Sequence, residues 1–149
     1  FDAAPVYYAW DKIMGDSLNI ETNFFYYKDY APELNFYSPV IIANNDYLKD
    51  NKEEAIKILR AIKKGYQYAI EHPEEAAEIL IKYAPELENK KAMIIESQKY
   101  LASQYATDKD KWGYIDPVRW NAFYNWLNEK GLTKNPIPEN TGFSNDYLE

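Results

Sequence analysis

Three aromatic rings and a carboxylate lie within five positions near the amino terminus, at Tyr7, Tyr8, Trp10 and Asp11. If residues 6–14 are helical, Tyr7 and Asp11 are four positions apart and share one face. An aromatic ring offers a stacking surface to a planar molecule, and a carboxylate accepts hydrogen bonds from an amino group. Alternatively, Tyr7 and Trp10 are packing residues and Asp11 is a solvated helix residue, because most aromatic residues at helical spacing belong to a core. The motif indicates either a ligand site or the start of the core.

No catalytic or metal-binding pattern accompanies this motif. The sequence has no Cys, which excludes disulfides, thiolate metal ligands and a cysteine nucleophile. The single His, His72, directly precedes Pro73, which favours an N-cap or loop position over a catalytic one. There is also no glycine-rich phosphate loop. We therefore expect binding without catalysis, with no cofactor and no metal.

The composition limits the class of partner. A chain of 149 residues is long enough for one ordinary domain. Its net charge of −7 argues against nucleic acid or an anionic membrane surface as the main partner. The 15 Tyr, 4 Trp and 6 Phe residues suit either a core or the lining of a ligand pocket. Residue 1 is Phe, so we expect a processed chain or a piece of a longer one.

The first third of the chain predicts one helix and two strands. Residues 6–14 are expected to form a helix that ends at Gly15. The stretches "LNIETNFFYYKDY" (18–30) and "FYSPVIIAN" (36–44) are rich in β-branched and aromatic residues, which favours strands. The apolar run Val40–Ile42 is typical of a strand buried on both faces, as in a mostly parallel sheet.

The rest of the chain predicts helices. Asn51 and Glu54 have the spacing of a capping box, and Pro73 suits a first helical position. Asp116 and Pro117 predict another helix start, which Gly131 would end. The predicted helices cover residues 51–71, 73–83, 88–105 and 117–130, followed by an extended tail.

Four stretches together resemble a known family: "FDAAPVYYAWD", "YSPVIIANNDYLKDN", "AIKKGYQYAIEHPEEAAEILIKYAPEL" and "WGYIDPVRWNAFYNWLNEKGL". They are similar to the carboxy-terminal half of the substrate-binding proteins of ABC importers. The nearest group captures pyrimidine precursors of thiamine and is related to the sulfonate and nitrate binders. The resemblance extends from residue 1 to about residue 146.

This resemblance implies an α/β fold of the two-lobe, periplasmic-binding-protein-like (type II) kind, with a ligand held between the lobes. The chain would be its helix-rich carboxy-terminal portion. Residues 1–35 would end the second lobe, and residues 36–149 would supply a crossover strand and helices that pack on the first lobe. The implied partners are a small-molecule ligand and an ABC permease in the membrane. The implied location is extracytoplasmic, in the periplasm or as a cell-surface lipoprotein, with the signal or anchor not present in this chain.

The resemblance also implies site residues. In the thiamine-precursor binders the matching Tyr and the acidic residue at the end of the opening motif line the ligand site, which points to Tyr7 and Asp11. Tyr8 and Trp10 are further candidates from the same motif. At the start of the crossover strand, Tyr37 and Ser38 would offer a ring and a hydroxyl group to the cleft. Their alternative is a buried strand aromatic residue and a turn serine.

Two other function classes remain open at this stage. A pyrimidine-making synthase shares the implied fold, but it depends on a cysteine-rich motif and a histidine. A helical protein-interaction module could instead be built on residues 51–131. No period of about 34 residues repeats there, which argues against a helical repeat protein. The sequence therefore favours a solute-binding component without catalytic activity.

Overall fold

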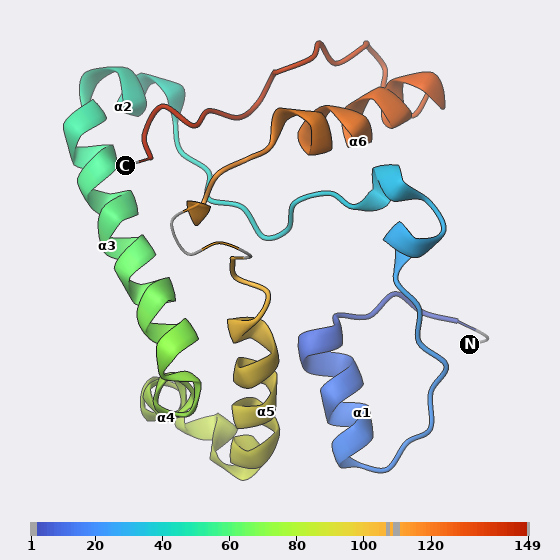
Figure 1. Ribbon diagram of the computed structural model, residues 1–149, viewed down its shortest axis with the longest axis vertical. Helices are drawn as coiled ribbons and strands as arrows, with labels where there is room; N and C mark the ends of the chain where they lie inside the picture. The colour runs from blue at the N-terminus through green and yellow to red at the C-terminus, as the bar shows by residue number, and fades with distance from the viewer. Residues whose placement is uncertain (1–2, 107, 109–110, 149) are drawn as a thin grey trace. The chain divides into compact units, whose positions relative to one another are not determined.

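The computed structural model describes residues 3–106, 108 and 111–148, and its regular structure is helical (Figure 1). The elements are η1 (Tyr8–Lys12), α1 (Ile13–Ser17), η2 (Tyr27–Asp29), η3 (Pro32–Leu34), α2 (Asn45–Asp50), α3 (Lys52–Glu71), α4 (Pro73–Tyr83), η4 (Pro85–Lys90), α5 (Lys91–Ala102) and α6 (Pro117–Glu129). Here η1 is a π-helix and η2, η3 and η4 are 3-10 helices. Across the described ranges, we find no helix with the length and apolar character needed to cross a bilayer.

The chain divides into two compact units. Unit 1 comprises residues 1–24 and 61–112, and unit 2 comprises residues 25–60 and 113–149. The long helix α3 contributes residues to both. The predicted division between residues 1–35 and residues 36–149 refers to the two lobes of a larger fold, and it stays a prediction.

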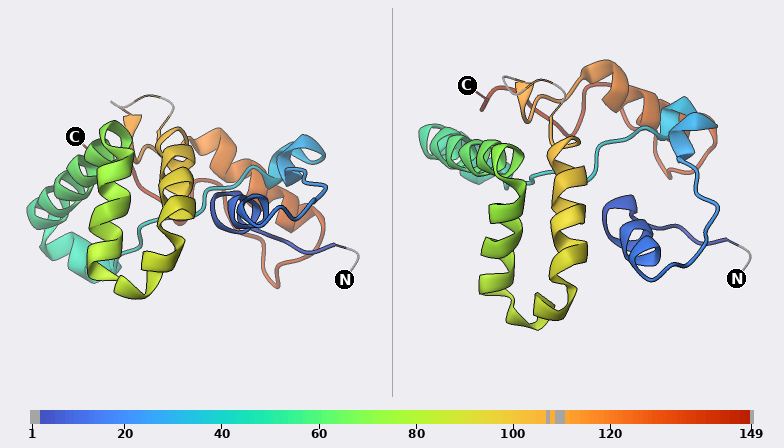
Figure 2. Two further views of the ribbon diagram at one scale, coloured as in Figure 1. Left: turned by 90° about the horizontal axis from the view of Figure 1, so that it is seen from below. Right: turned by 60° about the horizontal axis from the view of Figure 1, so that its bottom comes forward.

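Unit 1 is built around a helical hairpin of α4 and α5. Figure 2 shows the two helices side by side and antiparallel, joined through η4. Their facing side chains form an aliphatic core of Ala77, Ile81, Met93 and Ile94, which are at most 6% exposed. The amino-terminal helices η1 and α1 contact α5, and they pack Trp10, Ile13 and Met14 against this core. The core therefore anchors the segment that carries the opening motif.

The bounds of α4 follow from local chemistry, as predicted. Pro73 takes the first position, where a missing N–H costs no helical hydrogen bond. Glu74 and Glu75 in the first turn and Lys82 in the last complement the helix dipole. The helix ends at Tyr83, directly before Ala84 and Pro85. The preceding helix α3 likewise ends at Glu71, next to His72.

Unit 2 is organised around α6, whose start was also predicted correctly. The Asp116 carboxylate accepts hydrogen bonds from the N–H groups of Val118 at 2.7 Å and Arg119 at 3.2 Å. Past its end, Gly131 adopts a positive φ of 65°, a conformation that glycine tolerates best. Figure 1 shows residues 35–44 on one side of α6 and the carboxy-terminal tail on the other. Helix α6 is thus the scaffold for two irregular segments.

The two predicted strands are not observed, since the described residues contain no β-strand. In residues 18–30 the only regular structure is the 3-10 turn η2, and residues 36–44 have none. A strand exists only when a neighbour accepts and donates its backbone hydrogen bonds, and no described segment pairs with either stretch. Val40, Ile41 and Ile42 are accordingly 46%, 55% and 87% exposed. The α/β two-lobe architecture stays a prediction.

The bounds of two predicted helices also need correction. The first helical segment runs from Tyr8 to Ser17, so it starts and ends later than expected and passes through Gly15. Helix α2 was not foreseen. Asn51 directly precedes α3, as predicted, and its carbonyl accepts the N–H of Ala55 at 3.0 Å. Its side-chain amide also donates to the carbonyl of Tyr47 at 3.0 Å and closes the end of α2. The third predicted helix starts only at Lys91 and ends at Ala102.

Candidate functional site

Tyr7 and Asp11 are adjacent, although not in the way that a shared helix face predicts. Tyr7 is the N-cap of η1, with extended backbone angles of −93° and 118°. Its N–H donates to Oδ2 of Asp11 at 2.8 Å, while its carbonyl accepts from the N–H groups of Trp10 at 3.1 Å and Asp11 at 2.8 Å. The Tyr7 side chain is 76% exposed. The Asp11 carboxylate is therefore fixed to the main chain of a residue that is largely exposed.

The turn that carries this pair is a π-helix. The N–H of Ile13 donates to the carbonyl of Tyr8, five residues earlier, and also to that of Trp10. A π-turn is a rare departure from α-helical geometry that often occurs at functional sites. No feature of the amino-acid pattern predicts it.

Tyr8 and Trp10 are engaged inside unit 1. The Tyr8 ring stacks on Tyr100, with centroids 4.4 Å apart and an interplanar angle of 30°. It also meets Phe24 edge-on at 5.0 Å. Trp10 packs against the aliphatic core, with Nζ of Lys90 5.8 Å from its ring. These two rings hold the turn in place, whereas Tyr7 faces outward.

Sequence reasoning missed Tyr100 and Phe24 as neighbours of the motif. Tyr100 lies within the predicted helix of residues 88–105, but its partner is 92 positions away in the sequence. Phe24 lies in a segment predicted as a strand. No short-range signal connects either residue with Tyr8.

Tyr37 and Ser38 lie in unit 2, apart in the sequence from the opening motif. The Tyr37 hydroxyl accepts a hydrogen bond from the N–H of Asp116 at 2.9 Å. The Arg119 guanidinium lies 4.0 Å from the centroid of the Tyr37 ring, a cation–π contact. Ser38 is exposed. Tyr37 thus serves to attach residues 35–37 to α6.

A small hollow of about 100 Å³ borders this attachment, and its volume matches little more than one ring. Its lining is aromatic apart from one aliphatic side chain and one cation: Phe36, Tyr37, Val40, Arg119, Trp120, Phe123 and Tyr124. Arg119 Nε and a terminal nitrogen donate to the backbone and side chain of Asn35 at 2.6 and 3.1 Å. The cation is therefore engaged in holding the irregular segment.

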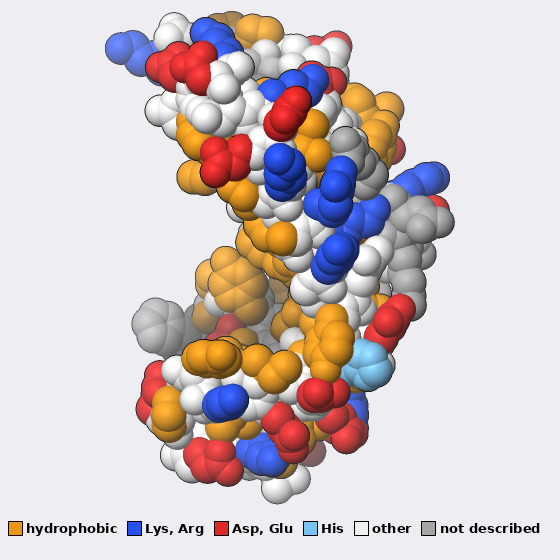
Figure 3. Space-filling model, turned by 90° about the vertical axis from the view of Figure 1, so that its left-hand side faces the viewer, with side chains coloured by type: hydrophobic (Ala, Val, Ile, Leu, Met, Phe, Trp, Pro, Cys, Tyr) orange, Lys and Arg blue, Asp and Glu red, His pale blue; other side chains and the backbone are white. Residues whose placement is uncertain are grey.

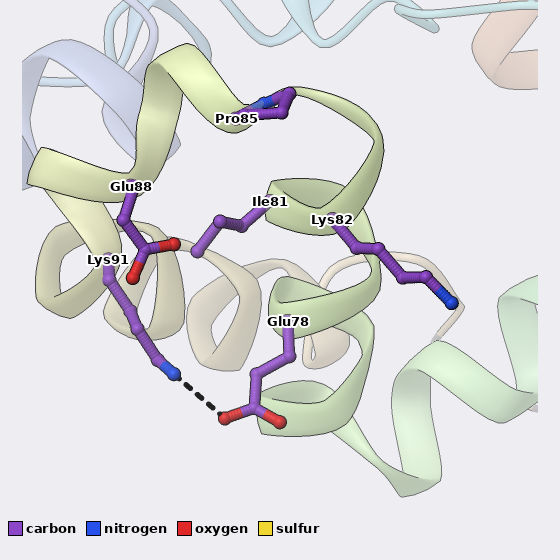
Figure 4. A pocket seen from close by; sticks show the side chains of 6 residues that line it. All are labelled: Glu78, Ile81, Lys82, Pro85, Glu88 and Lys91. Carbon is purple, nitrogen blue, oxygen red and sulfur yellow. Dashed lines mark hydrogen bonds and ion pairs between the residues drawn. The ribbon is translucent and has the colours of Figure 1, made fainter.

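A larger, open hollow of about 600 Å³ lies between α4, η4 and α5 in unit 1 (Figure 4). Nζ of Lys91 pairs with Oε1 of Glu78 at 3.0 Å, and this hydrogen bond raises the pKa of Lys91. Two acidic and two basic side chains line the hollow around Ile81 and Pro85: Glu78, Glu88, Lys82 and Lys91. The balance of charges gives it no preference for a cationic or an anionic ligand.

His72 takes the predicted N-cap position of α4, but its side chain makes no capping hydrogen bond. It is exposed, as Figure 3 shows in pale blue, and its ring lies 4.7 Å from that of Tyr68. In the described ranges no group of three His, Cys, Asp or Glu side chains is arranged to hold a metal ion. The Tyr7–Asp11 pair is therefore the candidate site with the clearest chemistry.

Comparisons with known proteins connect this chain with a family. A family model described as NMT1/THI5 like matches residues 1–76, half of the chain. The formylaminopyrimidine-binding protein of Halalkalibacterium halodurans is 24% identical over 107 residues, which cover 70% of this chain and 32% of that relative. The chain thus spans about a third of the length of the curated relative that it matches. All the predicted site residues lie within the range matched by the family model.

Proposed function

The chain belongs to the NMT1/THI5-like family, and on that premise we propose that it is the solute-binding component of an ABC importer that captures a small heteroaromatic ligand such as an aminopyrimidine thiamine precursor. The observation that carries the proposal is that Asp11, whose carboxylate accepts the backbone N–H of Tyr7, brings a hydrogen-bond acceptor next to a residue that is itself 76% exposed. The name of the relative, a formylaminopyrimidine-binding protein, supports the choice of ligand. The proposed role is binding without catalysis.

The chemistry of the pair suits an amino-substituted planar ring. Stacking on Tyr7 would contribute about 0.5–1.5 kcal/mol beyond the burial of area. An exocyclic amino group would donate to Asp11, and a hydrogen bond to a charged acceptor contributes about 1.5–3 kcal/mol. Because Oδ2 already accepts from the Tyr7 N–H, Oδ1 is the oxygen left for the ligand. The same carboxylate would repel a sulfonate or nitrate anion.

In the full two-lobed protein, residues 1–35 would end the second lobe and residues 36–149 would return to the first, so that a cleft between the lobes traps the ligand. Binding would favour the closed form, and the membrane permease would recognise that form. Such a protein works outside the cytoplasm, in the periplasm or anchored at the cell surface. These features rest on the family resemblance.

Calorimetric titration of the natural full-length protein tests the proposal. The probes are formylaminopyrimidine and an aminopyrimidine without the formyl group, with a sulfonate and riboflavin as controls. We expect micromolar or tighter binding of a pyrimidine and no heat from the controls. Absence of heat with both pyrimidines would overturn the ligand assignment.

The variant Asp11→Asn tests the role of the carboxylate in the same assay. The Asn carbonyl oxygen can still accept the Tyr7 N–H, so the turn should stay folded with an unchanged melting temperature. Loss of the negative charge should weaken pyrimidine binding by at least about tenfold. An unchanged affinity would remove Asp11 from the site. Asp16→Asn, in the next helical turn, is the matched control and should bind as the wild type does.

A further inference from the structure

The ring of Tyr8 is held on two sides, although it directly follows the exposed ring of Tyr7. On one side Tyr100 of α5 stacks on it, with centroids 4.4 Å apart. On another side Phe24 meets it edge-on at 5.0 Å. Tyr8 is half-buried, while Tyr7 is 76% exposed. Two neighbouring residues of the same type therefore have opposite environments.

The position of Tyr8 determines where Tyr7 and Asp11 project. Tyr8 is the first residue of the π-turn, and a single planar peptide joins it to Tyr7. Both backbone groups of Tyr7 are engaged with the same turn: the N–H with Asp11 Oδ2 and the carbonyl with the N–H groups of Trp10 and Asp11. A shift of the Tyr8 ring would therefore move the whole hydrogen-bonded unit.

Tyr100, which stacks on Tyr8, lies on the well-packed helix α5. Helix α5 buries Met93, Ile94 and Ser97, and it is the half of the hairpin that η1 and α1 contact. Tyr100 lies one turn beyond Ser97 on the same helix. Groups on a well-packed helix hold a site more exactly than groups on a loop do.

We propose that Tyr100 is a positioning residue for the Tyr7–Asp11 pair, acting through its stack on Tyr8. The consequence for ligand binding rests on the function proposed above. The geometric part concerns the free protein and is tested without a ligand.

The first test is amide hydrogen exchange in the ligand-free, full-length protein. Tyr100→Leu removes the stacking ring, so we expect roughly two- to tenfold faster exchange at the amides of Tyr7, Trp10 and Asp11. Tyr100→Phe keeps the ring and should retain their protection. Tyr83→Leu is the matched control, because Tyr83 lies on α4 and is 80% exposed. Unchanged exchange in Tyr100→Leu would overturn the proposal.

The second test is pyrimidine affinity, which a purely structural role would leave unchanged in a folded variant. Tyr100→Leu should weaken binding roughly two- to tenfold, and Tyr100→Phe should restore it. If Tyr100→Leu does not fold, Tyr8→Leu removes the same stack while leaving α5 intact.

A wild-type protein that binds no pyrimidine would defeat the proposed function alone, because amide exchange still decides the positioning role. Altered exchange with unaltered affinity would confirm that Tyr100 positions the pair and would overturn only the consequence for ligand binding.

Discussion

Unit 1 and unit 2 are each stabilised internally by a different kind of interaction. Unit 1 has an aliphatic core between α4 and α5, with Ala77 and Ile94 only 1% and 2% exposed. Helix α6 of unit 2 buries no side chain to that degree. It instead binds irregular chain through polar side chains and half-buried rings, such as Trp120, whose Nε1 donates to the carbonyl of Thr141 at 2.9 Å. The comparison shows two ways to order a chain. The helix hairpin of unit 1 is ordered by the burial of apolar side chains, and the irregular segments of unit 2 are ordered by hydrogen bonds to their backbone.

Ile94→Ala should have the largest effect and tests the first half of this comparison. The substitution leaves a cavity in the core of unit 1, and we expect a loss of about 2–5 kcal/mol in the free energy of unfolding. Urea denaturation measures it. Ile79→Ala on α4 is the control, because Ile79 is 43% exposed and should cost much less. Equal losses in the two variants would mean that burial does not hold unit 1.

Asn128→Ala tests the second half of the comparison, the role of backbone hydrogen bonds in unit 2. The Asn128 side chain donates to the carbonyl of Ile137 at 2.8 Å and accepts from its N–H at 2.9 Å. Without it both backbone groups lose their partner, and we expect a loss of about 1–3 kcal/mol in the free energy of unfolding. Asn125→Ala is the control, since Asn125 reaches only the exposed carboxylate of Glu139 at 2.9 Å. A larger loss in the control would contradict the role given to backbone hydrogen bonds.

Asp116→Ala removes the cap of α6 and should have a smaller effect. Two N–H groups at the start of the helix lose their acceptor, for an expected loss of about 0.5–2 kcal/mol. Thermal unfolding followed by circular dichroism measures it. Asp116→Asn keeps a capping oxygen and should recover most of the stability. A variant as stable as the wild type would show that the tail, rather than the cap, fixes α6.

The smallest expected effect concerns surface charge on unit 1. Lys99 bonds to Glu74 at 2.8 Å, and this hydrogen bond lowers the pKa of Glu74 in the folded protein. A carboxyl group with a lowered folded pKa stabilises the fold above its unfolded pKa, and this stability is lost as pH falls through the folded pKa. The stability difference between wild type and Glu74→Gln should therefore shrink on acidification. The pair is exposed, so the difference is small throughout, and denaturation across pH measures it. A difference that grows in acid would contradict this assignment.

The helix ends marked by a proline or a capping side chain were the most predictable part of the fold, because their causes are local. Pro73 at the start of α4 and Asp116 with Pro117 at the start of α6 act within one turn of themselves. Asn51 was placed correctly, directly before α3, but its second contact was not foreseen. Its side-chain amide also closes the end of α2, a short helix without enough residues to show a period.

The strands could not be decided from the sequence in the same way. Residues 18–30 and 36–44 have the composition of strands, but a strand depends on backbone partners that composition does not specify. For the candidate site, the choice of Tyr7 and Asp11 stays a prediction, while their predicted closeness is seen in the hydrogen bond from the Tyr7 N–H to Asp11. It did not predict the π-turn, which no feature of the amino-acid pattern indicates. It did not predict the contact of Tyr8 with Tyr100 either, because the two residues are far apart in the sequence.

The tail beyond α6 is attached in part through its main chain. Trp120 reaches the carbonyl of Thr141, Asn121 accepts the N–H of Asn140 at 2.8 Å, and Asn128 bonds both backbone groups of Ile137. Every amino acid except proline provides these backbone groups. In a saturation mutagenesis screen, many residues should therefore be acceptable at Ile137 and Thr141, and few at Asn128 and Trp120, which hold them. Asn140 should be less tolerant, because it adopts a positive φ of 57° and its side chain accepts from Asn121 at 3.0 Å.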